Sequence, residues 1–401
     1  PNCSPELYAD DECLGQLREI GTIVEDNIDE RLLFQSIANQ SRFDKTILSV
    51  FVSFASTCNF ACGYCYESYK DNPANPSASK MLNQDMWTRL LFFLRERIQK
   101  NSIKNLSIVF FGGEPLMNFE IVLKAAQDLH ALASSTTKVS LSLITNGSLL
   151  SSERIDDLHE YFDLVQITLD GYKSDHDKRR PYKNGNGSFE EIYKNLCSAV
   201  QVMGPKIALR INIDKGNCAR IVELLSLLHS EGYSGKIGSV SFSQVFPTQN
   251  EIENVSSFLD NPNNSLVMID DLMELQRRAI EMGFRIPKDY IDGPCSISSP
   301  NSFAVDEQLK VYKCPGYLYQ NPIGFINESG KMIVNNNFWY ECINLPANCA
   351  ADCVYGPICY GGCRWQAGGL NGVKCHKHIH DHFLKERIKI YTESLRRVKN
   401  T

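Results

Sequence analysis

The sequence has 401 residues, 43% of them hydrophobic, which suffices for a sizeable core and for two or three domains. A formal net charge of −6 argues against the basic surface of a protein that binds nucleic acid or an anionic membrane. No stretch has the pattern of a transmembrane helix or a signal peptide, so the fifteen cysteines favour metal binding in the cytoplasm over disulfides.

After a polar N-terminal extension (1–45), residues 46–250 alternate predicted strands and helices, which indicates a parallel sheet with right-handed crossovers. The strands are expected at 47–54, 106–111, 138–144, 164–169, 206–213 and 238–245. The helices are expected at 85–100, 119–133, 153–161, 189–202 and 220–231. Six units are too few for the usual eight-stranded barrel, so we predict an α/β fold with an open, partial (β/α)6 TIM-like barrel.

Three cysteines follow the first predicted strand in the spacing C-x3-C-x2-C, namely Cys58, Cys62 and Cys65. Thiolates are soft ligands that select zinc, copper(I) or iron–sulfur clusters. Structural zinc sites usually have four protein ligands, whereas three local thiols suit a cubane cluster in which one iron stays open. A zinc knuckle or a disulfide loop is the alternative. The loop leaves the carboxyl end of a buried strand, which is where parallel α/β sheets bind ligands.

Polar residues also follow the later predicted strands. The second strand runs into Gly112, Gly113 and Glu114, where glycines let the backbone approach a ligand and the carboxylate can accept a hydrogen bond from an ammonium group. The third ends at Thr145-Asn-Gly147, a common turn that carries little information alone. The segment 176–181 after the fourth strand contains two adjacent arginines, for which a solvated surface pair is the alternative interpretation.

A helical bridge is expected at 251–290, with a helix at 266–283, and the composition changes after it. The C-terminal segment 291–401 contains eight cysteines: Cys295, Cys314, Cys342, Cys349, Cys353, Cys359, Cys363 and Cys375. A hairpin-like stretch separates the first two, and the spacing from the fourth to the seventh is C-x3-C-x5-C-x3-C. Eight thiols suit two four-thiolate clusters, with two zinc sites as the alternative. The four histidines at 376–382 are interpreted as the solvated face of a helix start.

Together these motifs resemble the radical S-adenosylmethionine (radical SAM) superfamily, whose signature C-x3-C-x-aromatic-C is matched with Tyr64 as the aromatic residue. The resemblance implies that the open iron of a [4Fe–4S] cluster binds SAM, whose reductive cleavage gives a 5′-deoxyadenosyl radical. It implies that Glu114 binds the methionyl amino group, that Thr168 approaches the ribose or methionyl part, and that Arg180 binds the SAM carboxylate. The implied cofactor-binding residues are Tyr64, Gly112, Gly113, Glu114, Thr168 and Arg180. In relatives, residues near Arg210 and Asn212 on the fifth strand contact adenine or substrate.

The C-terminal segment resembles the SPASM domain of radical SAM enzymes, which carries two auxiliary [4Fe–4S] clusters. By this resemblance the distal cluster is bound by Cys349, Cys353, Cys359 and Cys375. The cluster nearer the active site is bound by Cys295, Cys314 and Cys363, and either Cys342 supplies its fourth ligand or one iron is open. The first gap of the core motif is one residue longer than in the family, and Leu309 stands where the family has a glycine.

SPASM enzymes mostly act on peptides, so the resemblance implies a maturase that oxidatively modifies a ribosomally made precursor peptide, with an electron donor such as flavodoxin or ferredoxin. We favour a crosslink between side chains, because Pro315 follows Cys314 where sulfatase-maturating relatives carry an Asp as general base. The alternative is oxidation of Ser or Cys to formylglycine in a protein substrate. An iron–sulfur electron carrier is disfavoured, because it needs none of Glu114, Thr168 or Arg180. A monomer is expected, and the sequence does not identify the catalytic base.

Overall fold

The structure is a computed structural model that describes residues 24–65, 80–245, 265–287, 295–343, 353–359, 362–365 and 377–399. Cys349 and Cys375 lie outside the described residues, so the predicted distal group of thiols is described only at Cys353 and Cys359. Within the described ranges, no helix combines the length and the apolar character that crossing a bilayer requires.

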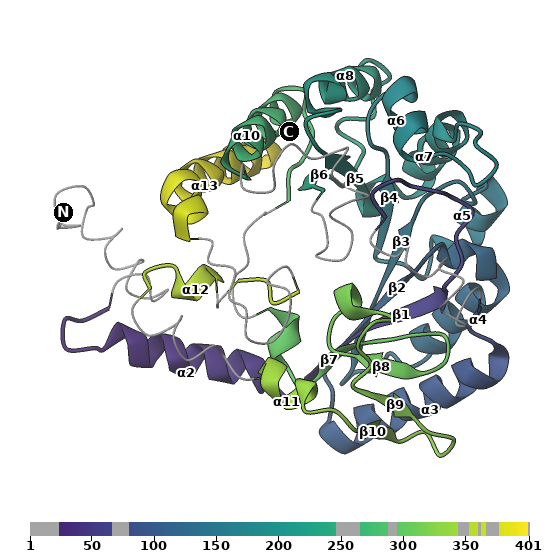
Figure 1. The fold of residues 1–401 in the computed structure, drawn as a ribbon, viewed down its shortest axis with the longest axis vertical. Coiled ribbons are helices and arrows are strands. Elements are labelled where there is room, and N and C mark those ends of the chain that lie inside the picture. The colour runs from purple at the N-terminus through teal and green to yellow at the C-terminus, as the bar shows by residue number, and fades with distance from the viewer. Residues whose placement is uncertain are drawn as a thin grey trace.

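One ten-stranded sheet organises the molecule, in the order β10-β9-β8-β7-β1-β2-β3-β4-β5-β6. Its parallel part consists of β1 (Ile47–Ala55), β2 (Asn105–Gly112), β3 (Lys138–Thr145), β4 (Leu164–Thr168), β5 (Ile207–Ile213) and β6 (Ser239–Gln244). All six predicted strands are confirmed to within one residue at each end. Figure 1 shows the sheet curving around with one side left open, which is the predicted partial barrel.

Helices cover the outer face of this curved sheet (Figure 1), as right-handed crossovers require. They are α3 (Gln84–Asn101), α4 (Phe119–His130), α5 (Ser152–Leu158), α6 (Lys173–Arg179), α7 (Phe189–Met203) and α8 (Ile221–Ser230). Five of these were predicted, with two of them ending three residues early, and the sequence analysis missed α6. Side-chain caps define several starts; for example, the Asn83 side chain accepts a hydrogen bond from the Met86 amide at 2.9 Å.

The core lies between the sheet and these helices. Along β1, Leu48, Val50 and Val52 alternate with less buried residues and have no exposed surface. Phe54, the next buried side chain on the same face of β1, stacks its ring on that of Phe110, with centroids 4.4 Å apart. Burial of each such side chain contributes ~1.5–3 kcal/mol. This packing fixes the strands in register and leaves their carboxyl ends to carry polar loops.

The C-terminal segment continues the same sheet instead of forming a separate one. β7 (Ser302–Val305) pairs in parallel with β1, and β8 (Lys310–Tyr312), β9 (Gly324–Ile326) and β10 (Met332–Val334) follow in antiparallel order. The predicted hairpin between Cys295 and Cys314 is therefore confirmed as β7–β8. At its turn Leu309 has φ of 64°, the left-handed conformation that favours glycine, which is the residue the family has here.

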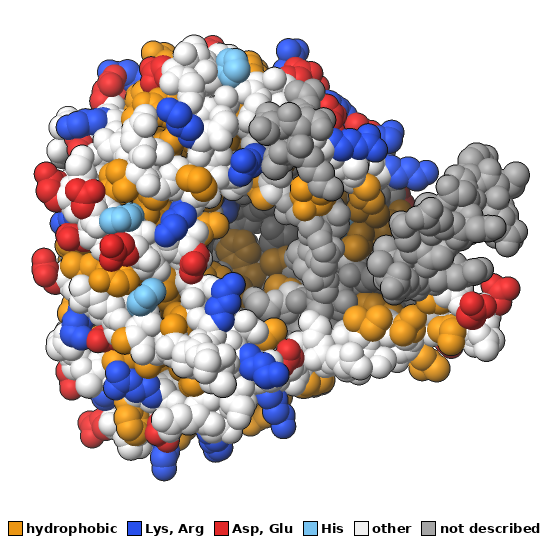
Figure 2. All heavy atoms as spheres, turned by 180° about the vertical axis from the view of Figure 1, so that it is seen from behind, with side chains coloured by type: hydrophobic (Ala, Val, Ile, Leu, Met, Phe, Trp, Pro, Cys, Tyr) orange, Lys and Arg blue, Asp and Glu red, His pale blue; other side chains and the backbone are white. Residues whose placement is uncertain are grey.

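The described residues also form helices around the open side, namely α2 (Glu30–Arg42), α10 (Ser265–Glu281), α11 (Phe338–Ile343), α12 (Gly356–Cys359) and α13 (Lys377–Lys399). The predicted helix at 266–283 is confirmed as α10, and the predicted helix at the histidines is confirmed as α13. These two helices pack side by side (Figure 1), and an ion pair of 2.8 Å joins Arg277 to Glu386. Figure 2 shows that the molecule is hollowed near the centre of one face.

Candidate active site

A cavity of about 770 Å³ lies at the carboxyl ends of the parallel strands. The ends of β2 to β6 line it, together with the cysteine loop after β1, two C-terminal cysteines and α13. Such a volume is typical of ligand sites, which span roughly 300–1,000 Å³. Its lining includes eight of the residues singled out from the sequence for the SAM site: Cys58, Cys62, Cys65, Tyr64, Gly112, Gly113, Thr168 and Arg180.

The cysteine loop is held by the segment that follows α6. The Ala61 amide donates to the Pro181 carbonyl at 2.9 Å, and the Lys183 amide donates to the Asn59 carbonyl at 3.0 Å. The Phe60 ring meets the Tyr182 ring edge-on, with centroids 4.9 Å apart. These contacts couple the cysteine spacing to the arginine segment, although more than 110 residues separate them in sequence.

Asn146, in a turn that seemed weak from sequence, contacts the first cysteine. Its Nδ2 lies 3.8 Å from Cys58 Sγ and donates to Asn59 Oδ1 at 2.8 Å. The Phe60 amide also points at this sulfur, at 3.4 Å. Burial raises the pKa of the Cys58 thiol to about 12, so the thiolate requires a bound metal to replace its proton. Hydrogen bonds of this kind to the ligand sulfur shift the reduction potential of a bound cluster.

The donor set fits an iron–sulfur cluster better than a single ion. No three or more His, Cys, Asp or Glu side chains in the described ranges are arranged to bind one metal ion. A cubane cluster does not require that arrangement, because each thiolate binds a different iron. Half-buried Cys58, Cys62 and Cys65 on one cavity wall provide three thiols and leave open space beside them.

Gly112 and Gly113 form part of the wall because the chain passes too close to the cysteine loop for a side chain. A Cβ on Gly112 would lie 2.4 Å from the Ala55 carbonyl oxygen, and one on Gly113 would lie 2.3 Å from that of Thr57. Gly112 also has φ of 127°. The two glycines therefore allow the end of β2 to lie directly against the start of the cysteine loop.

Glu114 is not among the residues that line the cavity. Its side chain is fully buried. Its carboxylate accepts hydrogen bonds from Thr145 Oγ1 and the Asn146 amide, both at 2.7 Å, and from the Leu116 amide at 3.0 Å. Burial raises the pKa of this carboxyl group, and the three hydrogen bonds oppose that shift. Glu114 thus joins the ends of β2 and β3; its contact with an amino group stays a prediction.

We expect Glu114→Gln to lower the free energy of unfolding by ~1–3 kcal/mol, because the carboxamide NH2 would face a buried donor, either the Thr145 hydroxyl or the Asn146 amide. Chemical denaturation of the SAM-free protein measures this change. Glu160→Gln, at an exposed turn, is the matched control and should have no measurable effect. A variant as stable as the wild type would contradict a structural role for Glu114.

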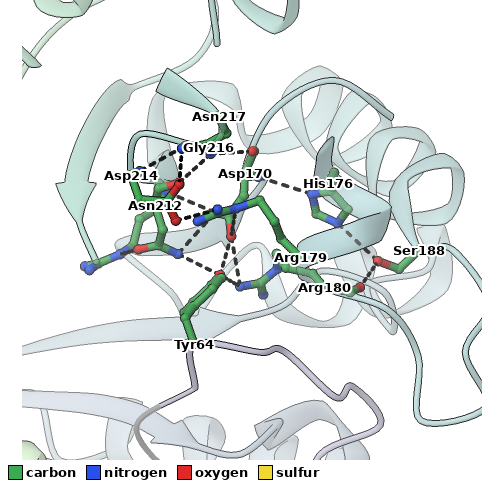
Figure 3. Close-up of polar contacts among 11 residues, drawn as sticks. Tyr64, Asp170, His176, Arg179, Arg180, Ser188, Asn212, Asp214, Gly216 and Asn217 are labelled. Carbon is green, nitrogen blue, oxygen red and sulfur yellow. Dashed lines mark hydrogen bonds and ion pairs between the residues drawn. The ribbon is translucent and has the colours of Figure 1, made fainter. Parts of the chain in front are cut away.

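Arg180 belongs to a buried polar network that Figure 3 shows. Its Nη1 donates to the Tyr64 hydroxyl at 2.5 Å and lies 3.9 Å from Asp170 Oδ2, to which the same hydroxyl donates. Asn212 Nδ2 also donates to Tyr64, at 3.1 Å. The neighbouring Arg179 has a different role, since its Nη1 donates to Asp214 at 2.6 Å. Of the two arginines, Arg180 is the one that lines the cavity, as the family pattern predicts.

His176 and Asp177 fix the backbone beside Arg180. Burial, reinforced by Arg180, lowers the pKa of His176 to about 3, so the ring is neutral. Its Nδ1 accepts from the Asp170 amide at 3.1 Å, which places its proton on Nε2, 3.1 Å from Ser188 Oγ. The Ser188 hydroxyl in turn donates to the Arg180 carbonyl at 2.6 Å. Asp177 accepts from two amides at the start of α7.

The opposite wall of the cavity comes from the C-terminal segment. Cys314 and Cys363 line it, whereas the other described thiols of this segment do not. On α13, His380 and Arg387 also line the cavity, so His380 is not part of a fully solvated face. His380 faces the cavity because α13 packs against α10 and turns one side toward the ends of the strands.

The radical SAM superfamily model matches residues 52–228, the stretch that contains the cysteine loop and the parallel strands β2 to β5. The sequence is 25% identical over 333 residues to the cysteine-type anaerobic sulfatase-maturating enzyme of Clostridium novyi (strain NT), covering 77% of this chain and 86% of that protein. It is 25% identical over 168 residues to the radical SAM cyclopropyl synthase TigE of Paramaledivibacter caminithermalis, covering 39% of this chain and 34% of that protein.

Two solved structures share the fold. The structure of anSMEcpe with bound AdoMet and the Kp18Cys peptide matches with a TM-score of 0.67 and 16% identity, covering 86% of this chain and 99% of that one. The structure of SuiB from Streptococcus suis bound to the precursor peptide SuiA matches with a TM-score of 0.58 and 14% identity, covering 90% and 85%. The predicted α/β partial-barrel fold is confirmed by both.

Proposed function

We propose that the chain is a radical SAM peptide maturase that oxidatively modifies a ribosomally made precursor peptide by forming a crosslink between side chains. One observation carries the proposal: the three thiols of the radical SAM loop share a cavity with Cys314 and Cys363. A peptide side chain in that cavity would lie between the centre that cleaves SAM and a second redox centre.

In this proposal Cys58, Cys62 and Cys65 bind the [4Fe–4S] cluster that holds SAM. When bound, this cluster would supply the electron for reductive cleavage of SAM. Arg180 binds the SAM carboxylate, and its guanidinium is oriented by Tyr64 and Asp170. Thr168, buried at the end of β4, lines the cavity beside the ribose or methionyl part.

The C-terminal segment would bind two auxiliary clusters as a SPASM domain, the distal one through Cys349, Cys353, Cys359 and Cys375. The nearer auxiliary cluster would be the electron acceptor when the crosslink forms. SAM, when bound, would supply the oxidant that removes one hydrogen atom from the peptide, and forming the new bond would release one proton and one electron. The nearer auxiliary cluster would take up that electron, and a donor such as flavodoxin or ferredoxin would supply the electron for SAM cleavage. The support for a peptide substrate is that anSMEcpe and SuiB were solved with bound peptides.

Formylglycine formation is the second candidate, favoured by the 25% identity to a sulfatase-maturating enzyme. Two features of the cavity weigh against it. Pro315, which follows Cys314, has no acid–base group, and the described lining contains no Asp or Glu that could serve as the base.

The product distinguishes the two reactions. A precursor peptide sought among the short reading frames beside the gene, incubated anaerobically with enzyme, SAM and dithionite, should lose ~2 Da per bond formed, because each crosslink removes two hydrogens. The product should not react with a hydrazine, and fragmentation should give no backbone fragments between the joined residues. The Kp18Cys peptide should remain unchanged. An aldehyde that a hydrazine captures, with a full fragment ladder, would support formylglycine formation instead.

A further inference from the structure

Four cysteine-bearing segments of the C-terminal region meet beside the cavity. Cys295 precedes a short 3-10 helix (Ser296–Ser298) that packs against α11, the helix that contains fully buried Cys342. Cys314 follows β8, and Cys363 follows α12; both of these thiols line the cavity. Hydrogen bonds and ring contacts beside the cysteines join the segments in pairs.

Lys313, next to Cys314, donates from Nζ to the carbonyls of Ser299 and Ser302, the second at 2.8 Å, which ties it to the segment after Cys295. Arg364, next to Cys363, donates from Nη1 to the carbonyl of Glu341 at 2.6 Å, which ties it to Cys342. Tyr317 joins the two pairs, because its hydroxyl donates to the Arg364 carbonyl at 3.2 Å. Its ring also packs edge-on against Phe338 of α11, with centroids 5.0 Å apart.

These contacts bring the four cysteine-bearing segments together, with Cys314 and Cys363 at the cavity and fully buried Cys342 behind it. Four thiols match the donor set of a [4Fe–4S] cluster.

Lys313 is an unusual neighbour for a group of thiols. Its side chain is 1% exposed, with Nζ 4.5 Å from the centroid of the Trp339 ring. No ion pair with a carboxylate is found for Lys313 among the described residues. A buried ammonium group without a counter-charge costs several kcal/mol. A cluster with four thiolates carries net negative charge and would supply that counter-charge.

We propose that Cys342 is the fourth ligand of a [4Fe–4S] site formed with Cys295, Cys314 and Cys363, and that Lys313 is the buried cation that offsets its charge. No iron of this cluster is then left open for a substrate, so the cluster acts by electron transfer.

The positive charge of Lys313 makes reduction of the cluster more favourable, which suits an electron acceptor. The sequence left this choice open, because residues 296–301 contain no cysteine and Cys342 lies far from Cys314. The inference rests on the proposed function for the presence of the cluster.

The first test uses protein in which Cys58, Cys62 and Cys65 are Ala, so that the remaining iron reports on the C-terminal sites alone. In this background, Cys342→Ala should lower the iron content and give a [3Fe–4S] electron paramagnetic resonance signal after mild oxidation. Cys197→Ala, a half-buried thiol on α7, is the control and should change neither. Unchanged iron and spectrum in Cys342→Ala would overturn the ligand assignment. No iron at all in the background protein would instead contradict the proposed function.

A second variant keeps the proposal testable if Cys342→Ala does not fold. Lys313→Met retains the aliphatic stem and removes the charge, so the reduction potential of the cluster should become more negative in a spectroscopic redox titration. Lys331→Met, at an exposed turn next to β10, is the matched control and should leave the potential unchanged. An unchanged potential in Lys313→Met would overturn its role as the charge partner.

Discussion

Replacing Cys58, Cys62 and Cys65 together by Ala is expected to abolish release of 5′-deoxyadenosine from SAM under dithionite. The three thiols line the cavity with Arg180, so their loss removes the cluster without removing the rest of the SAM site. The iron content after anaerobic reconstitution should fall by about four from roughly twelve per chain, the content of three [4Fe–4S] clusters. Both quantities can be measured on the same preparation, by chromatography and by an iron assay.

Cys197→Ala is the matched control for this variant. Cys197 is half-buried on α7, and it is outside the described lining of the cavity. It should keep the iron content and the release of 5′-deoxyadenosine of the wild type. Release that persists in the triple variant would refute the assignment of these cysteines to the radical SAM centre, whatever the fate of the C-terminal clusters.

The sequence predicts the parallel sheet well, because its strands are short apolar runs between polar helices and turns. Five of the six barrel helices show apolar periodicity and were predicted for that reason. The exception, α6, reads Lys-Ser-Asp-His-Asp-Lys-Arg and has no apolar face. It is helical because its side chains serve the site: His176 contacts Asp170 and Ser188, and Asp177 caps the next helix. Such partners are distant in sequence and leave no periodic signal.

The site was predictable where the chemistry depends on local spacing, as in the cysteine loop and the glycine pair. It was not predictable where the contacts are non-local. Asn146 was seen as an ordinary turn residue, but it contacts Cys58, 88 residues away. The hydrogen bonds from Glu114 to the end of the next strand were not predicted either, and its contact with the cofactor stays a prediction. A polar residue at the carboxyl end of a parallel strand was the available signal in both cases, and it does not specify the partner.

Leu309 shows how a departure from the family pattern can be absorbed. A non-glycine residue in the left-handed region costs roughly 1–2 kcal/mol. The Leu309 side chain is 1% exposed, and burial of a leucine contributes ~1.5–3 kcal/mol. The cost of the left-handed backbone and the gain from burial are of similar size. The turn of the β7–β8 hairpin therefore tolerates leucine although its backbone lies in the left-handed region that favours glycine.

The buried network around Asp170 gives the second large expected effect. Two carboxylates, Asp170 and Asp214, balance the charges of Arg179 and Arg180 in this network. Asp170 is fully buried; its Oδ1 accepts from the Asn212 amide at 2.9 Å, and its Oδ2 accepts from Tyr64. Asp170→Asn leaves two buried guanidinium groups with one carboxylate. Removing one partner of a buried ion pair typically costs 3–5 kcal/mol, so we expect a loss of ~3–5 kcal/mol in the free energy of unfolding.

Denaturant titration without SAM, under anaerobic conditions, measures this loss, and Asp156→Asn on the exposed face of α5 is the control, expected within ~0.5 kcal/mol of the wild type. A double-mutant cycle with Arg180→Met identifies the cause, because the Asp170→Asn/Arg180→Met protein again has equal numbers of buried charges. It should be more stable than the sum of the single losses predicts, with a coupling energy of ~1–3 kcal/mol. Additive losses would mean that Asp170 stabilises the site through Tyr64 and Asn212 alone. Arg180 would then be oriented without a counter-charge from the protein, and the carboxylate it balances would have to come from the bound cofactor.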